Sequence, residues 1–514
     1  MIYFLYMWSF ENETTNRIIS MFKKGNNCMS KLNDRICIIG GGPSGLSSAM
    51  YLEKKGYTNY TIYEKLNKVG GKCWSPKIKV SHNGVEEERS FETGAIMGAI
   101  TYHAVSEMEE FGGYYHKGPD FKPGEPNMRR EFRNLDGTIS YWSDPKKDFS
   151  FKKLFGLLKL KRQMKKLNEL MQTKYVGYDC YGHLGVAKGE YYGISKGVEG
   201  YCGATKENSF PNYIKGTNPN LKDLALPFSE FCKLNGVEEV QRIWIAPFTS
   251  FGYGFFDEIP AALVMKYLDV TTALEFVNLR LWTWQDGTQE IYESVNRKLK
   301  HPAVLETEVV KVERPEGKVL VTTRNKDGVE KTEEFDRLIV TTPLDLFKNY
   351  ADATEDETKL FSRIIHERYC DYIATFEPGK SPNISGYLVD NMVPERLGHA
   401  MVYYNRWQYL DRDCPATVYA LANHTGTPDV DYDTVMKTMD EDMKKVGFPI
   451  KEKLYAQEVY YCPHVSAQDY ADGWYDKLDA LQGNKNTWYA GEIISFGDME
   501  DSCAASKDLV ERFF

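Results

Sequence analysis

The clearest pattern in the chain lies near its amino end, where short apolar runs alternate with glycines and polar residues. The largely β-branched run at 36–39 predicts a buried strand, and it ends in three glycines at 40–42. A helix is expected next, ending at Gly56, and a second strand at 60–63 ends on Glu64. Strand, glycine turn, helix and acid-tipped strand in this order are typical of the first crossover unit of a dinucleotide-binding α/β fold.

The residue types in this unit fit an adenosine diphosphate group. Gly40 permits the turn, Gly42 lets the backbone approach a phosphate, and Gly45 lets the helix and strand pack closely. The amino end of the helix would offer unpaired amides and a partial positive charge to a pyrophosphate. Glu64, about twenty residues further on, can accept hydrogen bonds from ribose hydroxyls. A glycine turn without a ligand and an exposed strand-end acid are the plainer interpretations, and this unit alone does not distinguish FAD from NAD.

The middle of the chain predicts a separate, helical region. Residues 151–167 interleave lysines and an arginine with Phe and Leu at near-helical spacing, so one face can be apolar and its rim cationic. Such a helix can make peripheral contact with an anionic membrane, or it can pack its apolar side inward as a cap, and the pattern allows both. Residues 176–220 are rich in Gly, Tyr, Asn and Lys without periodicity, which predicts a long loop or surface insertion.

The second half of the chain returns to the pattern of the nucleotide-binding unit. A helix is expected at 292–299, and strands at 304–313, 319–323 and 338–342. Segment 344–465 mixes strands and helices around the aromatic cluster MVYYNRW, and we assign it to substrate binding. The expected division is an N-terminal extension (1–33), a nucleotide-binding domain (34–115, 281–345 and 470–514), a helical cap (116–280) with an insertion near 183–215, and a substrate-binding domain (346–469).

Composition narrows the class of protein. A chain of 514 residues is too long for one compact core, so two or three lobes are expected. Its 64 Lys and Arg against 73 Asp and Glu argue against a general nucleic-acid binder. The aromatic content of 14%, with 35 Tyr, suits flat ligands and apolar tunnels, although ordinary core packing explains it equally well.

The cysteines and the amino-terminal segment indicate in which cellular compartment the protein is expected. Ten cysteines are scattered without the spacing of a zinc or redox motif, so no metal is expected and they are interpreted as reduced thiols of a cytoplasmic protein. The first ten residues are apolar, but they lack a basic leader and a cleavage site and are too short to span a bilayer. We therefore expect a loosely attached extension, or translation from Met29, in place of a signal peptide.

Motifs near both ends of the chain identify the cofactor by resemblance. Gly70, Gly71 and Lys72 follow Glu64, and the sequence Tyr-Ala-Gly-Glu ends at Glu492, before FGDMEDS. Together these motifs resemble the signature of the FAD-dependent amine-oxidase superfamily. The resemblance implies an α/β, Rossmann-like FAD-binding domain of the amine-oxidase/glutathione-reductase type, with an α+β substrate domain and a helical cap.

The same resemblance assigns roles to individual residues. Glu492 would hold the ribityl or phosphate part of FAD, the turn at 497–499 would face the isoalloxazine ring, and Val309 and Val310 would lie beside adenine, unless they are plain core valines. Most members carry Arg where Lys72 stands, so the charge is kept and the bidentate fork is lost. The cofactor-binding residues expected in this way are Gly71, Lys72, Gly94, Val310, Glu492 and Met499, besides Gly40, Gly42, Gly45 and Glu64.

Within that superfamily the sequence most resembles the polyunsaturated fatty acid isomerases, from about residue 35 to Phe514, apart from the insertion. Matching stretches include VGGKCWSP, ETGAIMGA, FGYGFFD and LWTWQDGTQ. The resemblance implies that a double bond moves by abstraction and return of a hydride at FAD. It also places Arg130 and Phe276 where the family clamps the fatty-acid carboxylate, which suits the planar fork of arginine. The alternative is a surface arginine and a core phenylalanine.

Two other functions stay open at this stage. Oxidation of an amine by oxygen would need aromatic faces over the flavin, for which Tyr460, Tyr461, His464 and Tyr470 are candidates, unless they serve packing. A flavin-binding protein without catalysis is the third possibility. The surroundings of Cys462, Tyr-Cys-Pro-His, do not resemble the site of a flavin thioether, so the FAD is expected to be non-covalent.

Overall fold

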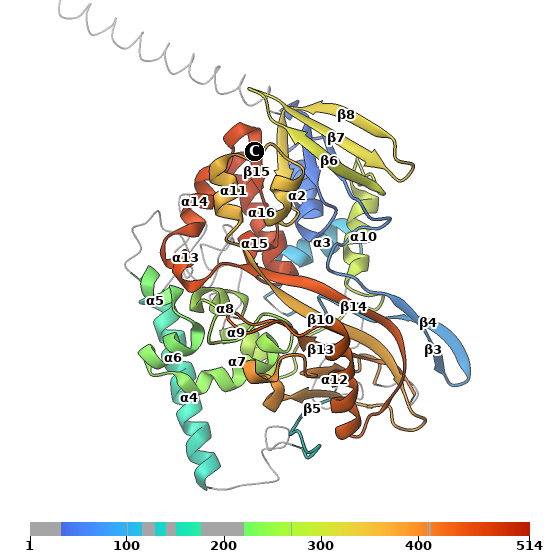
Figure 1. Ribbon diagram of the computed structural model, residues 1–514, viewed down its shortest axis with the longest axis vertical. Coiled ribbons are helices and arrows are strands. Elements are labelled where there is room, and N and C mark those ends of the chain that lie inside the picture. Colours follow the sequence, from blue (N-terminus) through green and yellow to red (C-terminus); the bar gives the residue numbers. More distant parts are fainter. Residues whose placement is uncertain are drawn as a thin grey trace, which may run out of the picture.

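The structure is a computed structural model that describes residues 32–99, 101–115, 129–139, 151–175, 220–268, 270–408, 410 and 413–514. Most of the expected N-terminal extension, and all of the insertion expected near 183–215, lie outside these described residues. Within them, a parallel sheet with its helices forms the upper part of Figure 1, and a larger mixed sheet with a group of helices forms the lower part.

The upper part is built on a four-stranded parallel sheet with the order β15-β9-β1-β2. Its strands are β1 (Ile36–Ile39), β2 (Tyr60–Tyr63), β9 (Arg337–Val340) and β15 (Thr487–Tyr489). All four residues of β1 are buried, as expected for a parallel strand covered on both faces. The predicted strands at 36–39 and 60–63 are confirmed, and the sheet joins three parts of the chain that lie far apart in sequence.

The face of this sheet that bears Cys37 and Ile39 packs against a small antiparallel sheet, and the face that bears Ile36 and Ile38 is covered by helices. They include α2 (Pro43–Lys54), α3 (Ala104–Gly112), α10 (Gln289–Lys298) and α16 (Met499–Phe513). Helix α2 packs against the C-terminal helix α16, and α3 packs against α10. A Cβ atom at Gly45 would lie 1.9 Å from the carbonyl oxygen of Gly40, so close packing of α2 on its own turn requires glycine there.

Two small antiparallel sheets extend from this part. One consists of β6 (Thr307–Glu313), β7 (Val319–Asn325) and β8 (Glu330–Phe335), and the other is the hairpin of β3 (Lys77–His82) and β4 (Val85–Ser90). Strand β6 begins later than the predicted residue 304, because Val304 makes only an isolated bridge to Tyr63 and Glu306 then turns the chain with a φ of 51°.

The lower part contains a six-stranded sheet with the order β14-β10-β13-β12-β11-β5. Its strands are β5 (Arg130–Arg133), β10 (Ile365–Phe376), β11 (Ser385–Leu388), β12 (Val402–Tyr404), β13 (Ala416–Leu421) and β14 (Ile450–His464). Helix α12 (Tyr432–Lys445) packs on one face, against Cys370 and Tyr372, while Tyr369 points to the other face. Residues 130–133 fell within the expected helical cap, but they pair with β11 as an edge strand instead.

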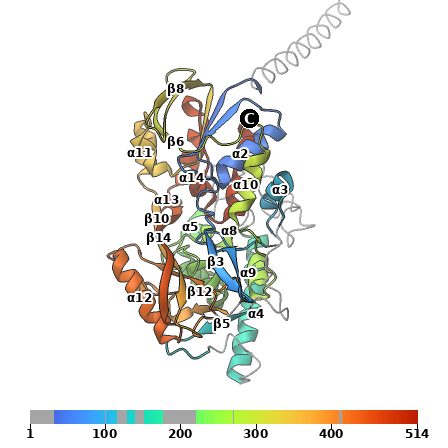
Figure 2. The ribbon, with the colours of Figure 1, turned by 90° about the vertical axis from the view of Figure 1, so that its right-hand side faces the viewer.

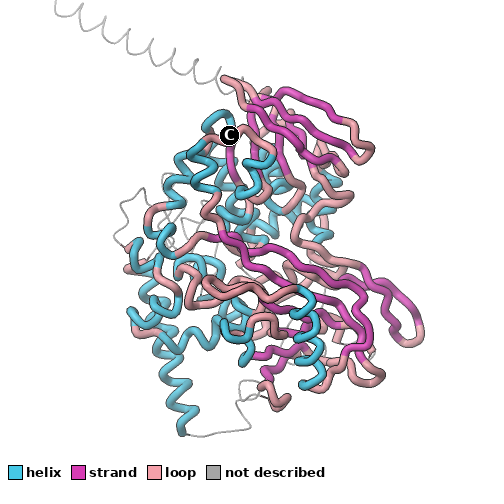
Figure 3. Tube along the Cα trace, viewed as in Figure 1, coloured by secondary structure: helices cyan, strands magenta, loops and turns pink. Residues whose placement is uncertain are grey.

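The remaining helices of the lower part lie on the other side of the sheet from α12 (Figures 2 and 3). They are α4 (Phe151–Gln172), α5 (Leu221–Ala225), α6 (Phe228–Asn235), α7 (Gln241–Thr249), α8 (Ala261–Tyr267) and α9 (Val270–Val277). Four other α-helices among the described residues are α11 (Glu355–Phe361), α13 (Ala467–Ala471), α14 (Trp474–Leu481) and α15 (Glu492–Ser495). Helix α4 continues past the predicted residue 167, because Leu160, Leu167 and Met171 form one buried stripe.

Candidate functional site

A cavity of about 830 Å³ lies where the parallel sheet meets the six-stranded sheet. Its walls come from the turn after β1, from β6, from the turn after β9, from β10 and from the amino ends of α15 and α16. The predicted cofactor residues that line it are Gly40, Gly42, Glu64, Gly71, Lys72, Gly94, Val310, Glu492 and Met499. Gly45 does not line it and has the packing role described above. The fold therefore brings residues from both ends of the sequence to one space.

One end of the cavity has the geometry of a phosphate cradle. Gly42 is the N-cap residue of α2, and it has no side chain that could accept a hydrogen bond from the first amides of the helix. A Cβ atom at Gly71 would lie 3.2 Å from the Cα atom of Gly42, so the two glycine turns approach each other closely. This arrangement leaves backbone amides and the helix dipole facing an anion, which fits a pyrophosphate.

Glu64 lies beside this cradle in a fixed orientation. The Gly41 amide donates to its Oε2 atom and the Leu66 amide donates to its Oε1 atom, both at 2.8 Å. The side chain is buried, and a carboxylate has about four acceptor positions, so lone pairs remain for the hydroxyls of a ribose. The residues present at this end thus fit the adenosine part of FAD.

Lys72 and Glu492 meet across the middle of the cavity. They form an ion pair, and the second carboxylate oxygen of Glu492 accepts a hydrogen bond of 2.9 Å from the Cys462 amide. Tyr461 donates to the Lys72 carbonyl oxygen at 2.9 Å. A Cβ atom at Gly94 would lie 2.0 Å from that same oxygen, so only glycine fits there. Lys72 is therefore in contact with three other parts of the chain, at Gly94, Tyr461 and Glu492.

At the opposite end, the turn before α16 exposes Gly497, Asp498 and Met499 to the cavity. Asp498 caps α16 by accepting a hydrogen bond from the Asp501 amide, and it also accepts one from the Tyr102 hydroxyl. Burial raises the pKa of Asp498 to about 7, and the nearby charge of Asp501 adds to the effect. Our sequence reasoning missed Tyr102, because 396 positions separate it from Asp498 and no motif joins them.

The cavity wall beyond this turn is aromatic. Tyr253 and Tyr267 stack with their ring centroids 3.8 Å apart, and Tyr369 and Phe251 lie further along the lining with Phe276. Of these, the sequence predicted only Phe276 as a site residue. The segment FGYGFFD carried the signal for Tyr253, but nothing in the sequence placed Tyr267 of α8 beside it.

Arg130 lies behind Phe276. The centre of its guanidinium group lies 4.4 Å from the centroid of the Phe276 ring, and its Nη2 atom donates to the Val277 carbonyl oxygen at 2.8 Å. Its Nη1 atom is buried and has no hydrogen-bond partner among the described residues. Burial lowers the pKa of Arg130 to about 10. The two residues expected to clamp a carboxylate thus lie together, with one cationic nitrogen unpaired.

The other aromatic candidates are not brought together. Tyr461 lines the cavity, but the neighbouring Tyr460 is 57% exposed, since successive residues of β14 point to opposite sides. His464 is buried outside the cavity lining, with Nδ1 facing the Cys462 carbonyl oxygen and a pKa lowered to about 4 by burial. Tyr470 is also buried outside the lining, against Tyr475. The aromatic set expected to hold an amine is therefore not assembled at the cavity.

Comparison with known families gives two matches. Residues 38–109 match the NAD(P)-binding Rossmann-like domain, and residues 103–369 match the flavin containing amine oxidoreductase family. The first covers the glycine turn and Glu64. The second includes the aromatic cavity wall and Arg130.

Known proteins of this kind are similar over different lengths. The crystal structure of the CLA-producing fatty acid isomerase from P. acnes has a TM-score of 0.78 and 40% identity, over 94% of this chain and 99% of that one. The polyenoic fatty acid isomerase of Ptilota filicina is 46% identical over 56 residues, which span 11% of this chain and 10% of that protein. Putrescine oxidase is similar in fold alone, with a TM-score of 0.60 and 12% identity.

The family match covers more than half of the 514 residues, and the isomerase structure is matched over nearly its whole length. The cavity also has the groups that an FAD molecule requires. The chain therefore belongs to the family of flavin-containing amine oxidoreductases and is an FAD-dependent enzyme.

Proposed function

We propose that this enzyme isomerises a polyunsaturated fatty acid. A hydride leaves a doubly allylic carbon and returns to another carbon of the same chain, so one double bond moves without net oxidation. When bound, FAD supplies a centre that takes up a hydride and gives it back. The observation that carries the proposal is Arg130, a partly buried cation just outside the cavity lining, whose buried Nη1 atom has no partner among the described residues and whose guanidinium group lies over the Phe276 ring of the cavity wall. The similarity to the CLA-producing isomerase supports the same reaction class.

In this proposal Arg130 anchors the carboxylate of the substrate. A carboxylate beside Nη1 would give this atom the hydrogen bond that it lacks, and it would offset the energy lost by burying the charge. The Phe276 ring lies 4.4 Å from the centre of the guanidinium group and so covers it from one side. The anchor fixes the distance from the carboxylate along the fatty-acid chain, and this distance selects the carbon that reaches the flavin.

The aromatic wall has a second role. Loss of a hydride leaves a delocalised allylic cation on the substrate, which water would trap. Tyr369 and Phe251 offer apolar ring surfaces along the lining, and ring faces attract a desolvated cation. Tyr461 turns its hydroxyl away toward the Lys72 carbonyl oxygen, so it presents ring to the cavity. These side chains exclude water without offering a nucleophile.

We infer that FAD is held without a covalent bond. Cys73 and Cys462 line the cavity, and both thiols are buried. Burial raises the pKa of Cys73 to about 12 and that of Cys462 well above its ordinary value, so neither is present as the reactive thiolate at neutral pH. Acid precipitation of the purified yellow protein should therefore release the flavin into the supernatant. Colour that stays in the pellet would contradict this inference.

The test of the reaction is incubation with a panel of polyunsaturated fatty acids, with and without oxygen, followed by chromatography of the products. We expect a product of unchanged mass with a conjugated-diene absorbance, formed equally well without oxygen. Bleaching of the flavin by amines under anaerobic conditions, with hydrogen peroxide released in air, would favour amine oxidation instead. Absence of either response would favour a flavin-binding protein without catalysis.

We also propose that α4 collects the substrate by peripheral contact with an anionic membrane. Phe155, Leu157 and Leu158 are exposed near the start of the helix, and Lys161 and Arg162 are exposed on the next turn. Apolar side chains rimmed by cations suit insertion among anionic headgroups. Among the described residues, no helix is long and apolar enough to cross a membrane.

A liposome assay tests this contact. Replacing Phe155 and Leu158 by Ser should reduce sedimentation with phosphatidylserine vesicles, and high salt should weaken the binding of the unchanged protein. Leu234→Ser is a matched control, because Leu234 is equally exposed but lies on α6. Equal sedimentation of all three proteins would overturn the proposal.

A further inference from the structure

The short connection between α15 and α16 has an unusual backbone. Phe496 has a φ of 31° and a ψ of 95°, in a region that residues with a side chain rarely adopt. Its ring is fully buried and its amide donates to the Glu492 carbonyl oxygen at 2.6 Å. Such a conformation is strained and persists only where its surroundings hold it.

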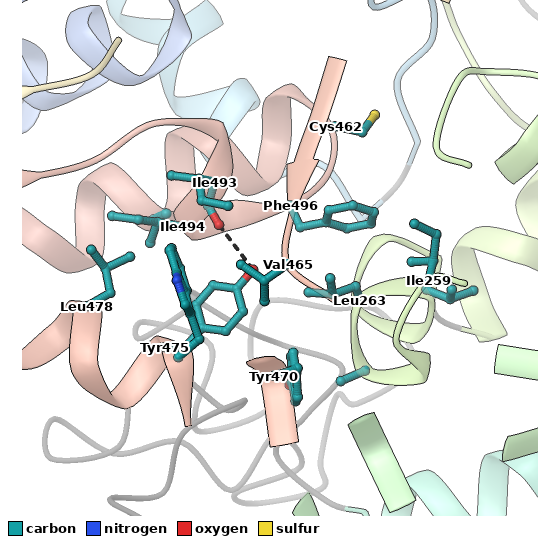
Figure 4. Packing of buried hydrophobic residues seen from close by; sticks show 14 of the residues in the cluster. Ile259, Leu263, Cys462, Val465, Tyr470, Tyr475, Leu478, Ile493, Ile494 and Phe496 are labelled. Carbon is teal, nitrogen blue, oxygen red and sulfur yellow. Dashed lines mark hydrogen bonds between the residues drawn. The ribbon is translucent and has the colours of Figure 1, made fainter. Parts of the chain in front are cut away.

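A buried cation holds this turn. Lys266 of α8 is 3% exposed, and its Nζ atom donates to the Phe496 carbonyl oxygen at 3.1 Å. The same Nζ atom forms an ion pair of 2.8 Å with Asp501, in the first turn of α16. Figure 4 shows the Phe496 ring in the packing cluster that also contains Leu263 of α8. One ammonium group therefore ties the strained carbonyl to the helix that follows it.

Lys266 acts at a distance from the cavity space. The residues of the turn that line the cavity are Gly497, Asp498 and Met499, and Lys266 is not among the lining residues. The backbone of Gly497 lies close to the carboxylate that pairs with Lys266, because a Cβ atom at Gly497 would lie 2.3 Å from Asp501 Oδ2. Any movement of the Phe496 carbonyl would therefore shift the amino end of α16 against the cavity.

We propose that Lys266 is a positioning residue, which holds the Phe496–Gly497 turn in its strained form and so fixes the amino end of α16 against the ring of the bound flavin. The inference rests on the proposed site in one respect, the placement of the isoalloxazine ring beside Gly497 and Met499. Reduction of a flavin adds negative charge to this ring, and the amino end of a helix stabilises such charge only when its amides point at it. Release of the turn would misdirect these amides.

The test compares Lys266→Met with Lys507→Met, which removes a cation of α16 that pairs with Glu107 of α3. With flavin alone, we measure the visible absorption spectrum of the bound cofactor, its dissociation constant, and the equilibrium of its reduction against a reference dye. Loss of a charged hydrogen bond at the turn should weaken flavin binding and disfavour reduction by about tenfold or more, with shifted absorption bands. The Lys507 variant should keep the spectrum and the reduction equilibrium of the unchanged enzyme.

A double variant separates position from charge. Lys266→Met combined with Asp501→Asn removes both charges, but it leaves the Phe496 carbonyl unheld, so the defect should remain. Recovery of the original spectrum and reduction equilibrium in the double variant would overturn the proposal, as would an unchanged spectrum in Lys266→Met. If the Met variant does not fold, Lys266→Gln, which keeps a neutral donor for the Phe496 carbonyl, should retain the original spectrum and reduction equilibrium, and loss of both would overturn the proposal. These measurements need no fatty acid, so they stand or fall separately from the isomerase reaction.

Discussion

Replacement of Arg130 by Met should abolish the preference of the enzyme for a free fatty acid over its methyl ester. Burial lowers the pKa of Arg130 from 12.5 to about 10, and this difference corresponds to about 3 kcal/mol, since one pKa unit is about 1.4 kcal/mol. A carboxylate beside the unpaired Nη1 atom would return half or more of this energy. The variant should therefore bind the acid about 10- to 150-fold more weakly.

The assay is a titration of the flavin spectrum with stearic acid and with its methyl ester, since a saturated chain has no doubly allylic carbon to react. The unchanged enzyme should prefer the acid, whereas Arg130→Met should bind acid and ester alike. Arg129→Met is the matched control, because Arg129 is the exposed neighbour and donates to the Asn383 carbonyl oxygen instead. If the Arg130 variant kept the original ratio of acid to ester affinity, the carboxylate anchor would be refuted.

Three further outcomes are expected from single residues. Gly94→Ala should prevent FAD binding, measured by the flavin content of the purified protein, because the new methyl group would collide with the Lys72 carbonyl oxygen. Glu64→Gln should raise the FAD dissociation constant by about tenfold, since one of its two backbone amides would face an amide donor. Burial raises the pKa of Glu357, but hydrogen bonds from Arg314 and other donors outweigh this effect and bring the pKa to about 2. Because the folded pKa lies below the ordinary 4.5, the stabilisation is full above that pH and is lost as the pH falls toward 2. Urea unfolding should therefore show about 3 kcal/mol of acid-dependent stability that Glu357→Gln lacks, and parallel pH curves for the two proteins would contradict this assignment.

Local chemistry explains which parts of the site were predictable from the sequence. The turn after β1 needs glycines at fixed positions and an acid at the end of β2, so its geometry can be predicted from the sequence. The partners of Asp498 and of the Phe496 carbonyl cannot be found in this way. Tyr102 and Lys266 reach them only because α16 packs near α3 and α8 in the folded protein.

Strand alternation shows a second limit. Tyr460 and Tyr461 are chemically almost equivalent in the sequence, but only Tyr461 faces the cavity. The pairing of β10 with β14 is irregular close to this point, and Cys462 has a φ of 48°. A bulge changes the side to which the following residues point, so His464 could not be placed by counting along the strand. The pairing of β5 at the edge of the sheet could not be predicted either, because a strand of four residues is too short to show a clear alternation of apolar and polar positions.

The ion pair between Lys72 and Glu492 has a consequence for biosynthesis. A ribosome makes Lys72 420 positions before Glu492, and β15 and α16, which complete the sheet and the cavity, are also made long after Lys72. Cofactor capture must therefore wait until β15, α15 and α16 have been synthesised, and a nascent chain stalled before residue 487 should be colourless even when FAD is abundant.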